Sequence, residues 1–170
     1  MQHGLSSGRF SGMIANYRWA NSTDYDVLGE VIFDAVRNGP SLYNEAQRRA
    51  WMEVPRSGPE WHKHLAEQSI AIAENDAAIV GLMSLKQDGY LDFAFIRPPF
   101  QGTGIFRILY AMIFKLALSQ GHSKILVHAS LMAQPAFSAM GFEIVKKESV
   151  DVDGQCLDRF EMQWLKQNPA

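Results

Sequence analysis

The segment from Ile96 to Leu118 constrains this chain more than any other, because it joins the end of a β-strand, a glycine turn and an amphipathic helix. Two glycines, Gly102 and Gly104, let the turn direct its backbone N–H groups toward one point. The helix expected to begin at Ile105 adds unpaired amides and the positive end of its dipole. A phosphate would be held there without any lysine, so the segment predicts a site for a phosphorylated ligand.

Two familiar nucleotide-binding patterns do not fit this turn. A dinucleotide-binding G-x-G-x-x-G would need a third glycine at the position of Arg107. A Walker loop would need Gly-Lys-Ser/Thr where Ile105, Phe106 and Arg107 stand. A nucleotide-dependent oxidoreductase is therefore disfavoured.

The residues Gln101-Gly102-Thr103-Gly104 resemble the Q/R-x-x-G-x-G/A pyrophosphate loop of the GNAT superfamily, the acetyl-CoA-dependent N-acetyltransferases. Phe106 departs from the pattern, since the family usually has Gly or Ala there. The family's contact is made by a backbone N–H, which Phe keeps. The resemblance therefore implies a Phe106 side chain that points away from the phosphates, into the core between helix and sheet.

A second resemblance lies in residues 124–145, where an apolar strand leads into a short helix and another strand. The superfamily's second cofactor motif reads N-x-x-A-x-x-x-Y-x-x-x-G-F, and its positions hold Ser130, Ala133, Phe137, Gly141 and Phe142. The spacing is kept and two side chains differ. The pattern is similar to that of a small bacterial subgroup with Ser and Phe at those positions and a proline, here Pro135, before the aromatic residue. Both motifs with their flanking elements span about residues 13–165.

The resemblance implies an α+β acetyltransferase fold, a twisted mixed sheet of about seven strands flanked by helices. Acetyl-CoA, the co-substrate, would bind where two central strands part, and backbone N–H groups at the end of the strand before the loop would polarise the acetyl carbonyl. The implied cofactor-binding residues are Phe95, Ile96, Gln101, Gly102, Thr103, Gly104, Ile105, Phe106, Ser130, Ala133 and Phe137.

Composition fits one compact domain. The 170 residues, 47% of them hydrophobic, suffice for a single core, which we expect in residues 13–170 after a loose polar tail of residues 1–12. A formal charge of −2 gives no excess of positive charge, so binding to nucleic acid or to an anionic membrane is not expected. Cys156 is the single cysteine, is expected to be buried and inert, and fits a reducing compartment. With no membrane-length apolar run and no secretion signal, a cytoplasmic location is expected, and a homodimer stays open.

Periodicity and turn residues predict the order of the elements. Strands are expected at 16–21, 69–74, 79–86, 90–96, from 124, at 142–150 and at 156–165, with tight turns at Asn75-Asp76, Asp88-Gly89 and Asp153-Gly154. Helices are expected from Thr23, at 44–51, at 59–68 and from Ile105 to Gly121. The first should bury Val27, Leu28, Val31, Ile32, Ala35 and Val36, and the last Ile105, Ile108, Leu109, Met112 and Leu116.

Acetyl transfer to an amine needs a base, because a primary amine with a pKa near ~10 is mostly protonated at neutral pH. Alternation along the strand at 90–96 places Tyr90, Asp92 and Ala94 on one face and Leu91, Phe93 and Phe95 on the other. The superfamily commonly carries its carboxylate base on this strand, which makes Asp92 the candidate catalytic base, acting directly or through water. The alternative is a strand Asp with a purely structural hydrogen bond.

The tyrosine that often protonates the departing thiolate in this family is replaced by Phe137, which is expected to form a hydrophobic wall against the cofactor. Water could protonate a thiolate, since a thiol has a pKa near ~8.5. Tyr110 is another candidate donor, although its mid-helix position favours core packing. A catalytically degenerate acyl-CoA-binding sensor or interaction module is the alternative function.

The acceptor amine is expected to meet Tyr43, Trp51 and Tyr90 as substrate-binding residues. Tyr43, Gln47 and Trp51 recur at helical spacing, which fits either core packing or the border of an acceptor pocket. Aminoglycoside, polyamine, amino acid and protein N-terminus all remain open as acceptors.

Three histidines could suggest further chemistry. His62 and His64, two positions apart on a helix, should point apart and lie at the surface, so no metal site is predicted. His128 lies near the end of its strand, where a structural histidine is favoured over a catalytic one.

Overall fold

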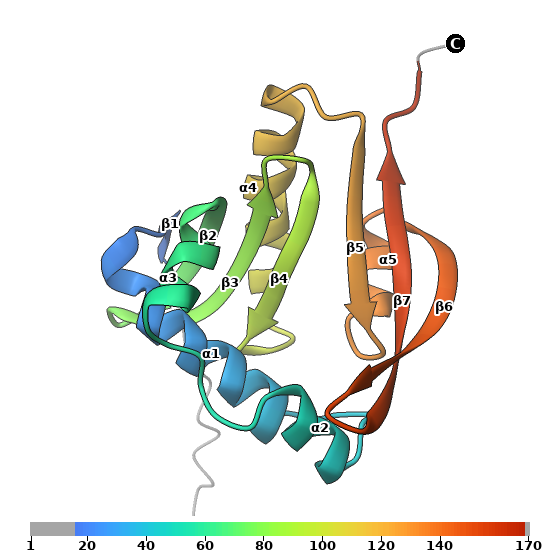
Figure 1. Cartoon of the computed structure of the whole chain (residues 1–170). Helices are drawn as coiled ribbons and strands as arrows, with labels where there is room; N and C mark the ends of the chain where they lie inside the picture. The colour runs from blue at the N-terminus through green and yellow to red at the C-terminus, as the bar shows by residue number, and fades with distance from the viewer. Residues whose placement is uncertain (1–15, 169–170) are drawn as a thin grey trace, which may run out of the picture.

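The computed structural model describes residues 16–168, which form a seven-stranded sheet with helices on both faces (Figure 1). The elements in chain order are β1 (Asn16–Trp19), a 3-10 turn (Ser22–Asp24), α1 (Tyr25–Asn38), α2 (Glu45–Trp51), α3 (Pro59–Ala66), β2 (Gln68–Asn75), β3 (Ala78–Lys86), β4 (Tyr90–Ile96), a second 3-10 turn (Pro98–Phe100), α4 (Ile105–Ser119), β5 (Lys124–Ser130), α5 (Gln134–Ala139), β6 (Glu143–Val152) and β7 (Gln155–Leu165). The expected tail at 1–12 and the expected start of the domain at residue 13 lie outside the described residues.

The sheet has the strand order β1-β2-β3-β4-β5-β7-β6 and is mixed, because β4 and β5 run parallel and every other neighbouring pair is antiparallel. This confirms the predicted fold class. The parallel pairing covers only Tyr90 with Leu126 and Leu91 with Val127, after which β4 and β5 part (Figure 1). The sheet therefore opens in its middle rather than at its edge.

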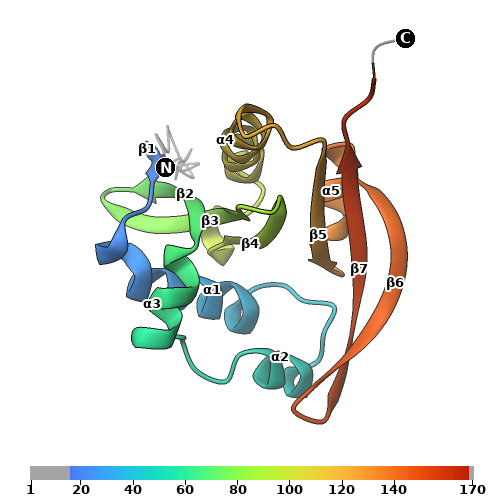
Figure 2. The same cartoon turned by 45° about the horizontal axis from the view of Figure 1, so that its top comes forward.

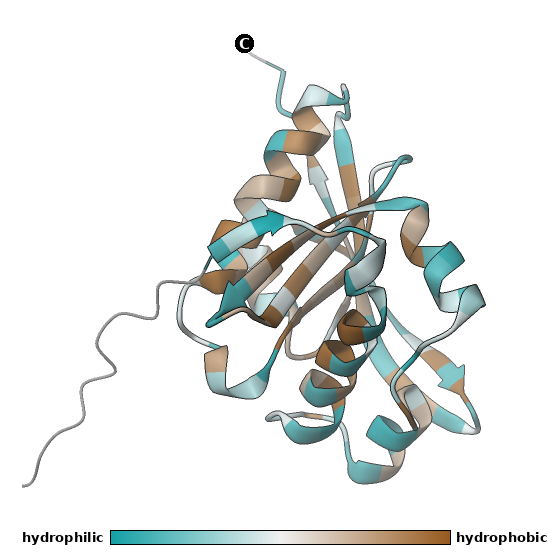
Figure 3. Ribbon diagram, turned by 90° about the vertical axis from the view of Figure 1, so that its left-hand side faces the viewer, coloured by the Kyte–Doolittle hydropathy of each residue, from teal (hydrophilic) through white to brown (hydrophobic). Residues whose placement is uncertain are grey.

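Two hydrophobic cores fill the two faces of the sheet, and Figure 2 shows α4 and α5 on one face and α1 and α3 on the other. The first core contains Leu109, Ile113 and Phe137, and the second contains Leu28 and Leu65, all at most 1% exposed. Figure 3 shows the corresponding apolar bands on the central strands and on the helices. Burial on both faces explains why the central strands are almost wholly apolar.

The turns follow the sequence closely, with one shift. Asp153 (φ 47°) and Gly154 (φ 81°) form the predicted turn between β6 and β7. Between β2 and β3 the left-handed residues are Asp76 (φ 49°) and Ala77 (φ 64°), one position later than predicted. The first strand ends before Asn21, because the side chain of Asn21 caps the following 3-10 turn.

Two predicted helix faces were partly wrong. Helix α4 buries Leu109, Ile113 and Ala117, whereas Ile108 is 45% exposed. The helix carries apolar residues on nearly every side, so periodicity alone does not fix which side meets the sheet. In α1, Val27 is 37% exposed, although the rest of the predicted face turns inward or stays partly covered.

The predicted alternation along β4 breaks at a β-bulge. Met83 pairs with Ala94 and Leu85 pairs with Leu91, so that two residues of β4 lie opposite Ser84. The buried hydroxyl of Ser84 accepts a hydrogen bond of 3.0 Å from the Phe93 N–H. A bulge of this kind reverses the side-chain alternation beyond it.

The reversal changes which core each side chain joins. Leu91 and Ala94 pack in the core under α4, whereas Phe93 and Phe95 pack in the core under α1 and α3. The prediction that Leu91 and Phe93 share a face was therefore wrong.

Candidate active site at the parted strands

Two adjoining cavities of about 400 Å³ and about 300 Å³ lie where β4 and β5 part. The smaller one reaches Gln101, Gly102 and Phe106 beside the start of α4, and the larger one reaches the side chains of α3, β6 and β7. Their linings share Trp51, Ala94, Phe95, Ser130 and Ala133. A ligand could therefore extend from the glycine turn through the opening in the sheet.

The glycine turn has the geometry expected from the sequence. Gly102 (φ 73°) and Gly104 (φ 89°) are left-handed, and a Cβ at either would meet no atom within 4 Å. Glycine is required there by the backbone conformation rather than by space. Helix α4 begins at Ile105, as predicted, and no side chain caps it. Its first amides lack helical partners, which is the arrangement that holds an anion.

Two side chains of the glycine turn form hydrogen bonds to nearby backbone carbonyls. The Gln101 amide donates to the Ile96 carbonyl at 3.0 Å, and the Thr103 hydroxyl donates to the Phe100 carbonyl. These contacts tie the turn to the end of β4.

Phe106 lines the smaller cavity, and its side chain packs against the core between α4 and the sheet, where it was predicted to lie. Its ring meets the Phe137 ring nearly at right angles, with centroids 5.2 Å apart, and Phe137 meets Phe142 at 5.1 Å. Phe137 is 1% exposed and forms part of the wall of the larger cavity. Because the ring packs in the core, it does not cover the backbone N–H of Phe106.

The second motif shapes the opposite wall. The Ser130 hydroxyl at the end of β5 accepts a hydrogen bond of 3.1 Å from the Ala133 N–H. A serine therefore fixes the turn into α5, and both residues line both cavities.

Asp92 lies in the larger cavity, and one of its oxygens is shared by two donors. His64 Nε2 and Gln68 Nε2 each lie 2.8 Å from Asp92 Oδ2. The Asp92 side chain is 16% exposed and that of His64 is 38% exposed. The bulge next to Phe93 holds this carboxylate toward α3.

His64 is partly at the surface, with 38% of its side chain exposed, but it also lines the larger cavity, which was not predicted. His62 does point elsewhere, and its Nε2 lies 2.7 Å from Asp26 Oδ1 on the outer side of α3. The helical spacing separated the two histidines correctly but did not show which one faces the sheet. The signal was available in Trp61 and Leu65, an apolar i, i+4 pair that is buried and sets the inner face of α3.

A second polar group lies deeper in the same cavity. The Tyr90 hydroxyl is 2.8 Å from His128 Nδ1, and His128 Nε2 lies 3.5 Å from Glu148 and 3.8 Å from Glu161. Burial, followed by the charge of Arg159, lowers the pKa of His128. Burial also raises the pKa of Tyr90. His128 is thus a partnered, neutral histidine at pH 7.

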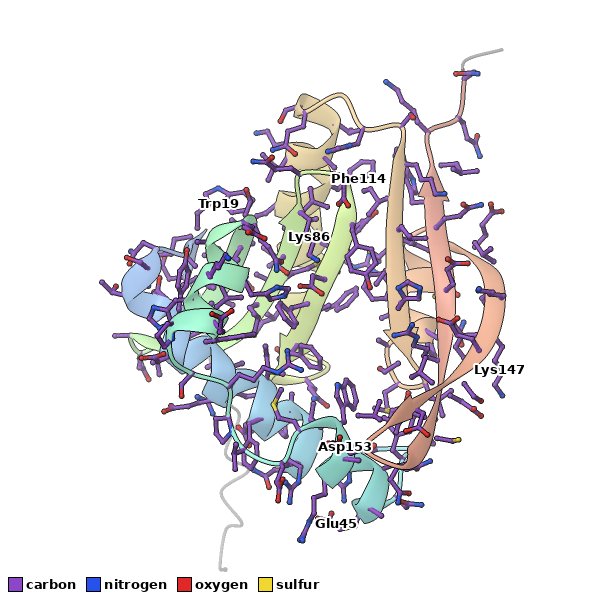
Figure 4. All side chains as sticks on the ribbon, viewed as in Figure 1. Trp19, Glu45, Lys86, Phe114, Lys147 and Asp153 are labelled. Carbon is purple, nitrogen blue, oxygen red and sulfur yellow. The ribbon has the colours of Figure 1, made fainter. Side chains whose placement is uncertain are left out.

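Lys86 lies above Tyr90, with its ammonium 5.5 Å from the centre of the ring, and Figure 4 labels it at the end of β3.

Two side chains of the segment that begins at Tyr43 form hydrogen bonds to the backbone of β7, in the hairpin of β6 and β7. The Tyr43 hydroxyl donates to the Asp158 carbonyl at 2.6 Å and accepts from the Leu131 N–H at 3.1 Å, while the Gln47 amide donates to the Cys156 carbonyl at 2.8 Å. Figure 4 shows the hairpin tip, at Asp153, beside the start of α2, at Glu45.

Tyr43 is buried and Trp51 packs against the core under α1 and α3, as core packing predicts, whereas Gln47 lines neither cavity. The border of an acceptor pocket stays a prediction. Trp51 lines both cavities and meets the Tyr43 ring at 5.7 Å and the Phe95 ring at 5.9 Å.

Two further expectations had opposite outcomes. Cys156 is exposed, so the prediction that it is buried was wrong, because the neighbouring Leu157 takes the inward position on β7. Tyr110 packs in the core as expected, lines neither cavity, and has its pKa raised by burial.

The family model of the acetyltransferase (GNAT) domain matches residues 42–164, which is most of the chain. The protein belongs to the GNAT acetyltransferases.

Among its relatives, an uncharacterised N-acetyltransferase, YafP, of Escherichia coli strain K12 is 29% identical over 146 residues, which are 85% of this chain and 92% of the relative. The fold is similar to that of a GCN5-related N-acetyltransferase from Rhodopseudomonas palustris, with a TM-score of 0.80 at 23% identity over 88% of this chain and 94% of the other. It is also similar to YncA from Salmonella typhimurium, solved with its cofactor acetyl-CoA, with a TM-score of 0.64 at 18% identity over 92% and 96% of the two chains. In residues 16–168, no helix has the length and apolar character needed to span a membrane.

Proposed function

We propose that this protein transfers the acetyl group of acetyl-CoA to a primary amine. The observation that carries the proposal is the pair of adjoining cavities at the parted strands, one beside the uncapped start of α4 and the other lined by Asp92. It offers one end to a phosphorylated cofactor and the other to an amine, with the reacting groups meeting between β4 and β5. Membership of the GNAT family and the acetyl-CoA of the Salmonella relative support the cofactor.

The cofactor half of the site is proposed to use backbone groups. Amides from Gly102 to Phe106 would bind the pyrophosphate, and Phe95, Ile96, Ser130, Ala133 and Phe137 would line the path of the cofactor's arm. Beyond Leu91, β4 has no paired residue on its β5 side, so backbone N–H groups there can polarise the acetyl carbonyl. Oriented amides stabilise negative charge on that oxygen as the amine attacks.

The acceptor half is proposed to be the larger cavity. Tyr43, Trp51 and Tyr90 would contact the acceptor, and its proton would be accepted at Asp92, directly or through a neighbouring group. Phe137 has no hydroxyl, so the leaving thiolate would take its proton from the amine or from water. A sensor that binds acyl-CoA without turnover is the alternative, and it has no use for a carboxylate and a histidine in the acceptor cavity.

Binding is tested by the melting temperature with and without acetyl-CoA, which should rise for the wild-type protein. Gly104→Asp should abolish the rise, because a carboxylate would oppose the pyrophosphate. Gly121→Asp is the matched control, since Gly121 (φ 81°) lies at the other end of α4 and also has open space around it. Loss of the rise in both variants, or in neither, would contradict the assignment of the phosphate site.

Turnover is tested by thiol release from acetyl-CoA with 2-phenylethylamine, spermidine, kanamycin, tyrosine and a peptide with a free N-terminus. Release with at least one amine, together with formation of its acetyl amide, is expected of an enzyme. Binding of acetyl-CoA with no release from any amine would favour the sensor.

A further inference from the structure

His64 and Asp92 both line the larger cavity, which is proposed above as the acceptor half of the site. Its ring stacks on Trp61 at 6.2 Å and meets the edge of Phe93 at 5.8 Å, so helix α3 and the bulged strand together fix its plane. The side chain is 38% exposed and lines the cavity. An ordered imidazole that is open to a cavity can exchange protons with both an acceptor and water.

The two ring nitrogens have different surroundings. Nε2 is 2.8 Å from Asp92 Oδ2, whereas Nδ1 makes no hydrogen bond to any other described residue. Because a carboxylate can only accept, Asp92 selects the tautomer with hydrogen on Nε2 and leaves a lone pair on Nδ1.

Asp92 itself is less suited to meeting the amine. The oxygen that faces α3 already accepts two hydrogen bonds, from His64 and from Gln68. A carboxylate oxygen offers about two lone-pair sites, so these two donors occupy that oxygen and leave it little capacity for the ammonium group of an acceptor. The same contacts make it well suited to hold an imidazole in one orientation.

We propose that His64 is the catalytic residue that takes the proton from the acceptor amine, and that Asp92 is a positioning residue that orients the His64 ring. The inference rests on the acetyl transfer proposed above. His64 Nδ1 accepts one proton from the ammonium group, the amine lone pair attacks the thioester carbon, the C–N bond forms and the C–S bond breaks. The second amine proton leaves with the thiolate as the free thiol, and His64 returns its proton to water.

Other titratable groups around the cavity have partners of their own or lie farther from the His64 ring. Arg56, Tyr90, His128 and Arg159 line the same cavity, and Lys86 lies over the Tyr90 ring. Tyr90 and His128 are hydrogen-bonded to each other, and Arg159 is bonded to Glu148 at 2.8 Å. On the outer side of α3, Asp26 is engaged by His62. Of the two histidines that line this cavity, His64 has the closer carboxylate, with Asp92 Oδ2 at 2.8 Å from its Nε2, whereas the nearest carboxylate to His128 Nε2 is that of Glu148 at 3.5 Å.

The first test needs no acceptor. Long-range ¹H–¹⁵N correlation spectra of the wild-type protein, with the signal assigned by its loss in His64→Gln, report which ring nitrogen of His64 carries hydrogen. Hydrogen on Nε2 at pH 8 is expected, with the preference weakened in Asp92→Asn. Hydrogen on Nδ1 would overturn the inference, whatever the activity.

The second test is kinetic and uses acetyl-CoA with the amine of the panel above that releases thiol fastest. His64→Gln should lower kcat/KM by ~10²-fold or more and remove the acidic limb of the pH–rate profile. His62→Gln is the matched control, two residues away on the same helix and outside the cavity, and should keep both rate and limb. Free imidazole should restore part of the rate to His64→Ala.

The double variant separates the two roles. If Asp92 acts through His64, His64→Gln with Asp92→Asn should be no slower than His64→Gln alone. A wild-type rate and pH profile in His64→Gln, with a large loss in Asp92→Asn, would make Asp92 the base and sink the inference while leaving acetyl transfer intact. Absence of thiol release by the wild-type protein would instead count against the proposed function.

Discussion

Phe137→Ala removes a ring that belongs to the core under α4 and also lines the larger cavity. The ring is 1% exposed and meets Phe106 and Phe142 edge-on at 5.2 Å and 5.1 Å. Truncating a buried Phe costs about 3–5 kcal/mol, and each aromatic contact of this kind is worth about 0.5–1.5 kcal/mol beyond burial, so we expect the upper part of the range. For a chain of this size, that corresponds to a fall of about 8–20 °C in melting temperature.

The assay combines urea denaturation with titration of acetyl-CoA. Because Phe137 also walls the cavity, the variant should bind acetyl-CoA more weakly than wild type. Ile113→Ala is the control, since Ile113 is 0% exposed in the same core but lines neither cavity. It should lose about 2–5 kcal/mol of stability and keep its affinity for acetyl-CoA. A Phe137→Ala protein with wild-type melting temperature and affinity would refute the assignment of the ring as a wall.

Three further outcomes are expected. Phe137→Tyr should keep turnover, measured by thiol release, within a few-fold of wild type, since the site is organised without a hydroxyl there. Gly29→Ala should lower the free energy of unfolding, measured with urea, by about 1–3 kcal/mol, because the added methyl would lie 2.0 Å from the Arg56 carbonyl oxygen. Arg56 lines the larger cavity, so its displacement should raise the KM for the amine but not for acetyl-CoA. His128 has a lowered pKa in the folded protein, so it contributes stability above about pH 6.5 that is lost as the pH falls. His128→Asn should therefore flatten the decline in unfolding free energy between pH 7 and pH 5.

The features predicted well from sequence are those set by local chemistry. Left-handed backbone at Gly102 and Gly104 and the helix start at Ile105 follow from the residues themselves. The spacing of the second motif likewise placed Ser130 and Phe137 on the walls of one opening. In each case the residue type and its neighbours along the chain carry the information.

The features predicted poorly depend on contacts between distant segments. The bulge of β4 arises where Ser84 of β3 lies opposite two residues, and nothing within residues 90–96 announces it. The inner faces of α3 and α4 depend on how each helix meets the sheet, so the sequence does not show that His64 lines the larger cavity or that Ile108 is exposed. Cys156 was assigned to the core because its residue type is usually buried, but its strand turns that position outward.

Only two residue pairs join β4 to β5, so few backbone contacts connect strands β1 to β4 with strands β5, β7 and β6. A ligand bound between β4 and β5 contacts both parts of the sheet, so its binding free energy adds to the free energy of unfolding. The lifetime of the protein in a cell should then follow the supply of acetyl-CoA, because a chain without ligand unfolds more often and meets proteases in its open form. Under starvation for acetyl units, less of the protein would persist, with no change in its synthesis.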